Sequence, residues 1–200
     1  MTEKQQQEWQ KIRVQAAQLV IMANKLLNLV QDPVKVITKL AATLNGDCTR
    51  YRIDLTNHTE EIKMVLDQFQ NEINLAKKGY ATAPQIFENK ARKMGYDISQ
   101  LIDSKRNHIP QPNEDTIIYK IIFSMRDYIY ALSKANCVRK TYSPKSLNRR
   151  YSRSEKYYLV KYKNEATDKK FQDAIDFVIR CMDSSIHQEK GVIELLFKII

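Results

Sequence analysis

Apolar residues recur at alternating intervals of three and four positions along three stretches of the chain, and this spacing is the strongest constraint on the fold. The longest stretch places seven apolar residues on one helical face: Trp9, Ile12, Ala16, Leu19, Ala23, Leu26 and Val30. An α-helix returns to the same face every three to four residues, so this spacing predicts a helix with one buried seam. Val20 and Leu27 widen the seam, which favours a bundle core over a two-stranded coiled coil.

Two further stretches share this spacing, and shorter stripes predict additional helices. The second seam runs Ile62, Leu66, Phe69, Ile73, Ala76, Tyr80, and the third runs Ile118, Ile121, Met125, Tyr128, Leu132, Ala135. Only four glycines and five prolines occur in 200 residues, which indicates long helices joined by few turns. We therefore predict an all-α fold, a single helical domain over residues 1–200, built as a bundle of six to seven helices. Leu19, Leu26, Phe69, Ile121, Met125 and Ile175 are expected in its core.

Capping and turn residues predict where these helices begin and end. Starts are expected at Thr2 with Gln5, Asp32 before Pro33, Asn57 with Glu60, Thr82 with Pro84, Ser143 before Pro144, and Thr167. Glycines are expected at helix ends, with Gly191 preceding a separate, apolar final segment over 192–200 that must dock on the core or on a partner. Residues 104–114 contain two prolines and little apolar content, so they are the candidate linker and a possible sub-boundary.

A minor two-stranded β element is an alternative for two short segments. Tyr51–Leu55 alternates apolar and polar residues, as a half-buried strand does, and Tyr157–Tyr162 is rich in residues that favour strands. These two segments could pair with each other beside the helices.

The positive charge of the chain is concentrated in residues 139–163. This segment holds nine basic residues against one acid, so it carries +8 of the formal net charge of +10. It also holds five of the eleven tyrosines. Such a concentration attracts anionic partners. The segment has three interpretations: a helix after Ser143-Pro144, a strand, or a solvated loop. In a helix, Lys145, Arg149, Arg153 and Lys156 form one cationic stripe.

This basic, tyrosine-rich segment is the candidate contact surface. The predicted partner-binding residues are Lys145, Arg149, Arg150, Tyr151, Arg153, Lys156 and Tyr158. A protein partner is favoured, because exposed helical seams also recruit helices. Nucleic acid is an alternative, since rings stack on bases while cations meet phosphates, and anionic lipid is another. A homodimer formed through helical seams is a further alternative. The interpretation is a non-enzymatic interaction or adaptor protein.

Catalytic and metal-binding motifs are weak, and no cofactor or metal is predicted. Arg52 with His58 and Arg180 with His187 have a spacing similar to that of the HEPN ribonucleases, which are helical. The polar residue usual after that arginine is replaced by isoleucine and cysteine. A small ribonuclease that uses either pair is therefore the enzymatic alternative, and it requires Arg and His to converge on one phosphate.

The N-terminal stretch and the cysteines bear on the compartment. The first ten residues are polar and lack the apolar region of a secretory signal, and no stretch is apolar enough to span a bilayer. Three cysteines at wide spacings favour reduced, partly buried thiols. A cytoplasmic protein is expected, with delivery into a host cell as an alternative.

Overall fold

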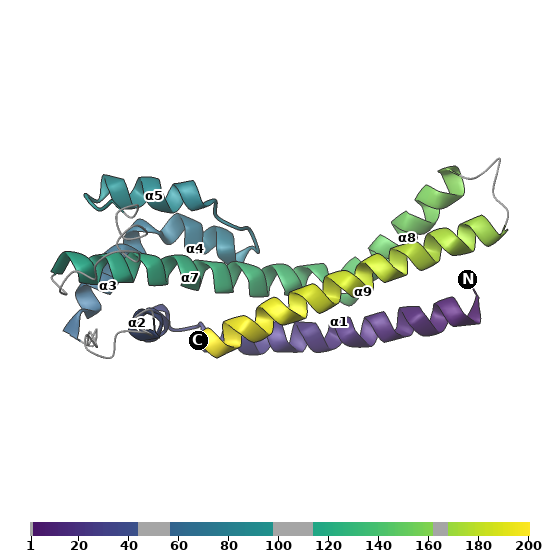
Figure 1. Cartoon of the computed structure of the whole chain (residues 1–200), viewed down its shortest axis with the longest axis horizontal. Helices are drawn as coiled ribbons and strands as arrows, with labels where there is room; N and C mark the ends of the chain where they lie inside the picture. Colours follow the sequence, from purple (N-terminus) through teal and green to yellow (C-terminus); the bar gives the residue numbers. More distant parts are fainter. Residues whose placement is uncertain (1, 44–56, 98–113, 162–167) are drawn as a thin grey trace, which may run out of the picture. The chain divides into compact units, whose positions relative to one another are not determined.

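The computed structural model describes residues 2–43, 57–97, 114–161 and 168–200 (Figure 1). These residues form eight α-helices and no strand, which confirms the all-α class. The helices are α1 (Glu3–Leu29), α2 (Pro33–Thr43), α3 (Thr59–Gln68), α4 (Gln70–Lys77), α5 (Pro84–Lys93), α7 (Glu114–Thr141), α8 (Pro144–Lys161) and α9 (Asp168–Ile199). The predicted strand at Tyr51–Leu55 and residues 104–113 of the predicted linker lie outside the described residues.

The helices group into two compact units. One unit comprises Met1–Lys25 and Cys137–Leu195, and the other comprises Leu26–Asn136 and Leu196–Ile200. The first unit therefore contains most of α1, all of α8 and most of α9. The second contains α2 to α5 and most of α7.

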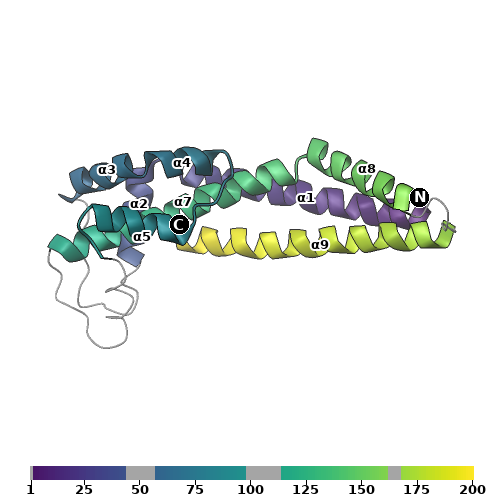
Figure 2. The ribbon, with the colours of Figure 1, turned by 90° about the horizontal axis from the view of Figure 1, so that it is seen from above.

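The first unit buries the long seam of α1 against α8 and α9. Trp9, Ile12, Ala16, Leu19 and Ala23 of α1 are buried, as are Leu147 of α8 and Ile175, Ile179, Ile186 and Ile193 of α9. Figure 2 shows α1, α8 and α9 lying side by side. Gln5 Nε2 of α1 donates to the Gln172 carbonyl of α9 at 3.0 Å, and the hydroxyl of Tyr142, which lies just before α8, is 2.7 Å from that of Ser185 in α9. The predicted burial of Leu19 and Ile175 is confirmed.

The second unit is built around the seam of α7. Leu26, Ile37, Leu40, Ile62, Phe69, Ile121, Met125 and Ile129 are all nearly inaccessible to solvent. The predicted helix through Tyr80 is divided at Phe69, whose backbone (φ −102°, ψ 13°) ends α3 and precedes α4. The seam nevertheless continues through the division, because Phe69 and Ile73 both stay buried. The ring of Phe69 stacks on Phe87 of α5, with centroids 5.3 Å apart.

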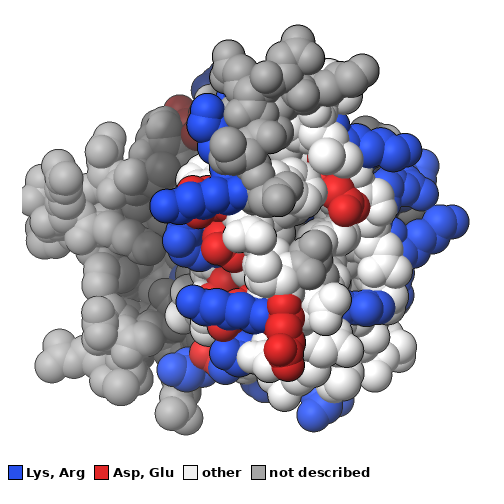
Figure 3. Space-filling view, turned by 90° about the vertical axis from the view of Figure 1, so that its right-hand side faces the viewer, with Lys and Arg blue, Asp and Glu red and all other residues white. Residues whose placement is uncertain are grey.

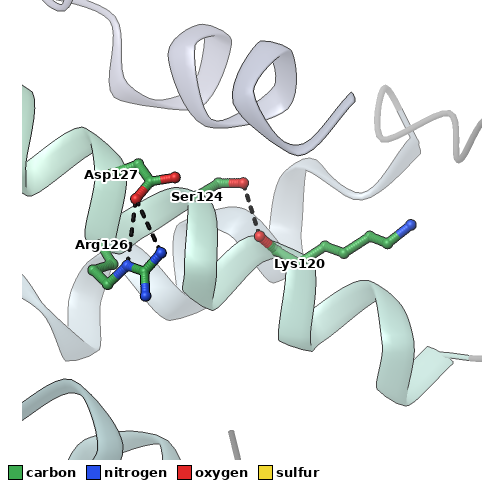
Figure 4. Close-up of polar contacts among 4 residues, drawn as sticks. All are labelled: Lys120, Ser124, Arg126 and Asp127. Carbon is green, nitrogen blue, oxygen red and sulfur yellow. Dashed lines mark hydrogen bonds and ion pairs between the residues drawn. The ribbon is translucent and has the colours of Figure 1, made fainter. Parts of the chain in front are cut away.

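Polar side chains buried along α7 are satisfied within the helix itself. The Ser124 hydroxyl donates to the Lys120 carbonyl at 2.8 Å, and beside it Arg126 pairs with Asp127 at 3.3 Å (Figure 4). Asn136 Nδ2 donates to the Leu132 carbonyl at 2.9 Å in the same way. Such back-bonding lets Ser and Asn sit in an apolar core without requiring a partner from another helix.

Three of the predicted caps form, at Thr2, Asp32 and Ser143, whereas the cap predicted at Thr82 is wrong, because Ala83 is the N-cap of α5 and no side chain caps that helix. Thr167 lies outside the described residues. The Thr2 amide donates to Gln5 Oε1 and the Gln5 amide donates to Thr2 Oγ1, so this pair is a capping box. Gly79 and Gly95 adopt the left-handed backbone expected after helix ends, with φ of 84° and 91°. The predicted Asn57–Glu60 box is wrong. The helix starts one residue later, at Thr59, with His58 as its N-cap and no side-chain cap bond.

The predicted break before a separate final segment is also wrong. α9 is one helix of 32 residues, and Gly191 lies inside it. A glycine in a helix interior costs about 1 kcal/mol relative to alanine. Ile186, Ile193 and Leu196 are buried on either side of Gly191, and their burial outweighs this cost. The expected docking of the final residues is seen for Leu196 and Ile200, which are buried.

The start of α2 offers a direct test of a predicted cap. Asp32 Oδ1 accepts a hydrogen bond from the Lys35 amide at 3.2 Å, as an N-cap carboxylate does. We expect Asp32→Ala to lower the free energy of unfolding by about 1 kcal/mol, and Asp32→Asn to lower it much less. Urea denaturation followed by circular dichroism measures both variants. Equal losses in the two would contradict a capping role.

Candidate interaction surface

The basic segment is helical over Pro144–Lys161, so the strand and loop interpretations are wrong for these residues. Ser143 caps the helix as predicted, because its hydroxyl accepts from the Ser146 amide at 3.3 Å. Leu147, Tyr151, Ser154 and Tyr158 recur on one face, where Leu147 is buried and the other three are half-buried. This apolar stripe within unit one explains why a segment so rich in charge forms a packed helix.

Four cations follow the opposite side of α8. Lys145, Arg149, Arg153 and Lys156 are exposed, and the helical spacing aligns them over three turns. No ion pair joins any of them to another residue in the described part of the chain. We call these four residues the cationic face of α8. Aligned cations without counter-charges repel one another and attract an anionic partner.

The tyrosines predicted to accompany these cations lie elsewhere on the helix. Tyr151 is half-buried and its ring lies 4.8 Å from that of Trp9. This burial raises the pKa of the Tyr151 phenol, and the charge of Glu155 raises it further. Tyr158 is also half-buried. Arg150 is exposed beside the Tyr142 ring, 6.0 Å from its centroid. The structure thus brings four of the predicted site residues onto one face and turns Tyr151 and Tyr158 away from it.

Sequence analysis missed an apolar patch at the end of α8. Tyr157, Leu159 and Val160 are 59%, 51% and 77% exposed. We call these three residues the apolar end of α8. The same residues gave the strand prediction, in which alternate side chains would be buried. A helix instead leaves all three exposed to solvent, in the turn that directly follows Lys156.

The surface around this part of the molecule is unevenly charged. Figure 3 looks onto the side where α8 ends, and Lys and Arg side chains gather along its right-hand edge, where few acidic side chains lie. Elsewhere in the same view, acidic and basic side chains alternate. Where acidic and basic side chains alternate, their charges largely cancel. A charged partner would therefore be attracted first to the region that is rich in Lys and Arg.

The Arg–His pairs of the enzymatic alternative lie on exposed helix surface or outside the described residues. Arg180 and His187 are exposed on α9, two turns apart, and His187 Nε2 lies 3.3 Å from Asp183 Oδ1. His58 Nδ1 lies 3.3 Å from Glu61 Oε1. A backbone hydrogen bond and then the His58 side chain hold the pKa of Glu61 below its usual value. Arg52 lies outside the described residues.

The second unit also contains a groove. An open groove of about 400 Å³ in the second unit is lined by apolar residues including Leu66, Ile73 and Tyr128. Its charged residues are exposed lysines and one aspartate. Burial raises the pKa of Tyr128, and the charge of Asp32 adds to this. Among the described residues, no group of His, Cys, Asp or Glu could hold a metal ion, and no helix has the length and apolarity to cross a bilayer.

Two cysteines differ from the expectation of partly buried thiols. Cys137 and Cys181 are free and exposed, and Cys48 lies outside the described residues. The Cys137 sulfur lies 3.8 Å from the Thr141 hydroxyl, which is neither a cation nor a base.

Comparison with known proteins returns no relative. No protein-family model, curated protein or solved structure matches the chain. The candidate surface is therefore defined by the charge and exposure of α8 alone.

Proposed function

We propose that this protein is a non-enzymatic interaction protein that binds an acidic segment of another protein through α8. The single observation that carries the proposal is the combination of the cationic face of α8 with its exposed apolar end. An amphipathic segment with carboxylates and a few apolar side chains would complement both parts. Carboxylates would steer the encounter, and burial of Tyr157, Leu159 and Val160 would supply the affinity.

The positions of the tyrosines favour protein over nucleic acid. Binding of single strands needs ring faces that are free to stack beside the cations. Tyr151 packs against Trp9, and Lys161 Nζ lies 5.9 Å from the centre of the exposed Tyr157 ring. The phosphates of a nucleic acid would therefore contact the cations of α8, but its bases would have few exposed tyrosine rings on which to stack.

Reversing the charge of α8 tests this proposal. We expect the variant Lys145→Glu, Arg149→Glu, Arg153→Glu, Lys156→Glu, which reverses the cationic face of α8, to fold normally, because each side chain is exposed, and exposed substitutions usually change stability by less than about 0.5 kcal/mol. Its affinity for a fluorescent peptide of alternating Glu and Leu should fall about a hundredfold, as four weak charge contacts are lost. Fluorescence anisotropy measures the affinity, and added salt should weaken binding by the unaltered protein.

A matched variant separates surface chemistry from net charge. Lys35, Lys39, Lys77 and Lys78 are exposed in the second unit, and their reversal to Glu changes the net charge equally. This control should bind the peptide nearly as well as the unaltered protein. Equal losses in both variants would show a non-specific charge effect and contradict the assignment to α8.

Binding measurements with other ligands, and a cleavage assay, test the alternative functions. Tighter binding to poly-uridine RNA, or to phosphatidylserine vesicles, than to the acidic peptide would replace the protein partner with nucleic acid or membrane. Metal-independent cleavage of labelled RNA that His187→Ala abolishes without unfolding would replace the binding protein with the ribonuclease.

A further inference from the structure

α9 carries a second seam on the side opposite its buried one. Six residues recur at intervals of four and three: Phe177, Cys181, Ser184, Gln188, Gly191 and Leu195. All six are exposed, and the large apolar members, Phe177 and Leu195, are 55% and 57% exposed. We call these six residues the outer seam of α9. A spacing of this kind is typical of a helix that packs along its length against another helix.

The outer seam matches itself when a second copy runs in the opposite direction. Setting Phe177 against Leu195 of the second copy places a large apolar pair at each end. The same register sets Cys181 against Gly191 and Ser184 against Gln188. Small residues in these middle layers let two helix backbones approach closely. A Cβ atom placed on Gly191 would have no neighbouring side chain within 4 Å, so the space beside this glycine is open.

The charges beside the outer seam agree with this register. In an antiparallel helix pair, each flank of the seam faces the same flank of the other helix. Arg180 of one copy then faces Glu194 of the other, and the contact occurs twice by symmetry. Within the monomer, Arg180 has no ion pair among the described residues, and Glu194 has only a long contact of 3.8 Å with exposed Lys190. On the other flank, half-buried Val178 faces Val192.

A parallel arrangement loses the charge match. It would still pair the apolar ends, Phe177 with Phe177 and Leu195 with Leu195, but it would place Arg180 opposite Ser185 on the facing flank. The opposite charges of Arg180 and Glu194 would then not meet. The flanking charges of the seam therefore select the antiparallel orientation.

We propose that two copies of this chain associate through the outer seam of α9 in an antiparallel helix pair. The interface is independent of α8 and of any partner that α8 binds. Two apolar layers flanked by two ion pairs make a small contact, so the dimer is weak and concentration-dependent.

Charge reversal with rescue tests both the interface and its register. Sedimentation equilibrium of the full chain should show a mass that rises from one to two copies with concentration. Arg180→Glu and Glu194→Arg should each weaken association about tenfold, because attraction becomes repulsion at two symmetric places. The double variant Arg180→Glu, Glu194→Arg should recover most of the affinity. Arg13→Glu, an exposed site on α1, makes the same charge change and should leave association unaltered.

Replacement of the apolar ends supplies the second arm. Phe177→Ser with Leu195→Ser should leave circular dichroism unaltered and the protein monomeric at every concentration. A chain that is monomeric without substitution would overturn the proposal, as would a dimer that survives the loss of Phe177 and Leu195. Failure of the double charge variant to recover, with its helical spectrum intact, would overturn the antiparallel register.

Discussion

Phe69→Ala is expected to lower the free energy of unfolding by about 3–5 kcal/mol, the range typical of aromatic truncation in a core. The Phe69 ring is fully buried, stacks on Phe87, and lies 5.3 Å below the Lys90 ammonium. Removal of the ring leaves a cavity at the junction of α3 and α4. The helix ends on both sides limit how far the surrounding residues can move to fill this cavity. Urea denaturation, followed by circular dichroism and by tyrosine fluorescence, measures the loss.

The control for this substitution is an exposed leucine on the same helix as Ile73 and Ala76 of the buried seam. Leu75, on α4, is 37% exposed, and Leu75→Ala should cost less than about 1 kcal/mol. Similar losses for Phe69→Ala and Leu75→Ala would mean that the α3–α4 junction is not packed as described.

Lys90→Met is expected to cost about 3 kcal/mol, because it leaves a buried carboxylate without its counter-charge. The Glu72 side chain is only 4% exposed, and its Oε2 lies 2.5 Å from Lys90 Nζ. Lys90 Nζ also donates to the Gln68 carbonyl at 2.8 Å, so one ammonium serves the carboxylate and the end of α3. Methionine keeps the length of the stem, so the loss reports the charge more than the packing.

A double variant separates the charge from the packing. Glu72→Met together with Lys90→Met removes both charges, and a buried ion pair can often be replaced by apolar residues at little cost. The double variant should therefore be more stable than Lys90→Met alone. If the two changes simply add, the Glu72–Lys90 pair is not coupled and the account of this contact is wrong.

Helices and their buried faces could be predicted from sequence because a seam depends only on local spacing. All six residues expected in the core are buried, and the caps at Thr2, Asp32 and Ser143 form. Errors occurred where tertiary packing decides between local alternatives. Phe69 separates α3 from α4 although the buried seam continues through it, and Gly191 lies inside a helix because distant residues bury its neighbours.

The candidate surface was predictable in charge but not in composition. Spacing alone aligned Lys145, Arg149, Arg153 and Lys156, and all four are exposed. The burial of Tyr151 could not be predicted, because its ring packs against Trp9, which is remote in sequence. The outer seam of α9 was not predicted because four of its six positions are small or polar, and a search for apolar spacing does not find such positions.

The connectivity of the first unit has a consequence for synthesis on the ribosome. Its core joins the first 25 residues to helices that begin at Pro144 and Asp168. At about 5–20 residues per second, the apolar seam of α1 emerges roughly ten seconds or more before α9 can cover it. During this interval Trp9, Ile12 and Leu19 are open to chaperones or to other nascent chains. Translation speed across the intervening region should therefore affect the yield of folded protein, even for synonymous codon changes that leave every residue unaltered.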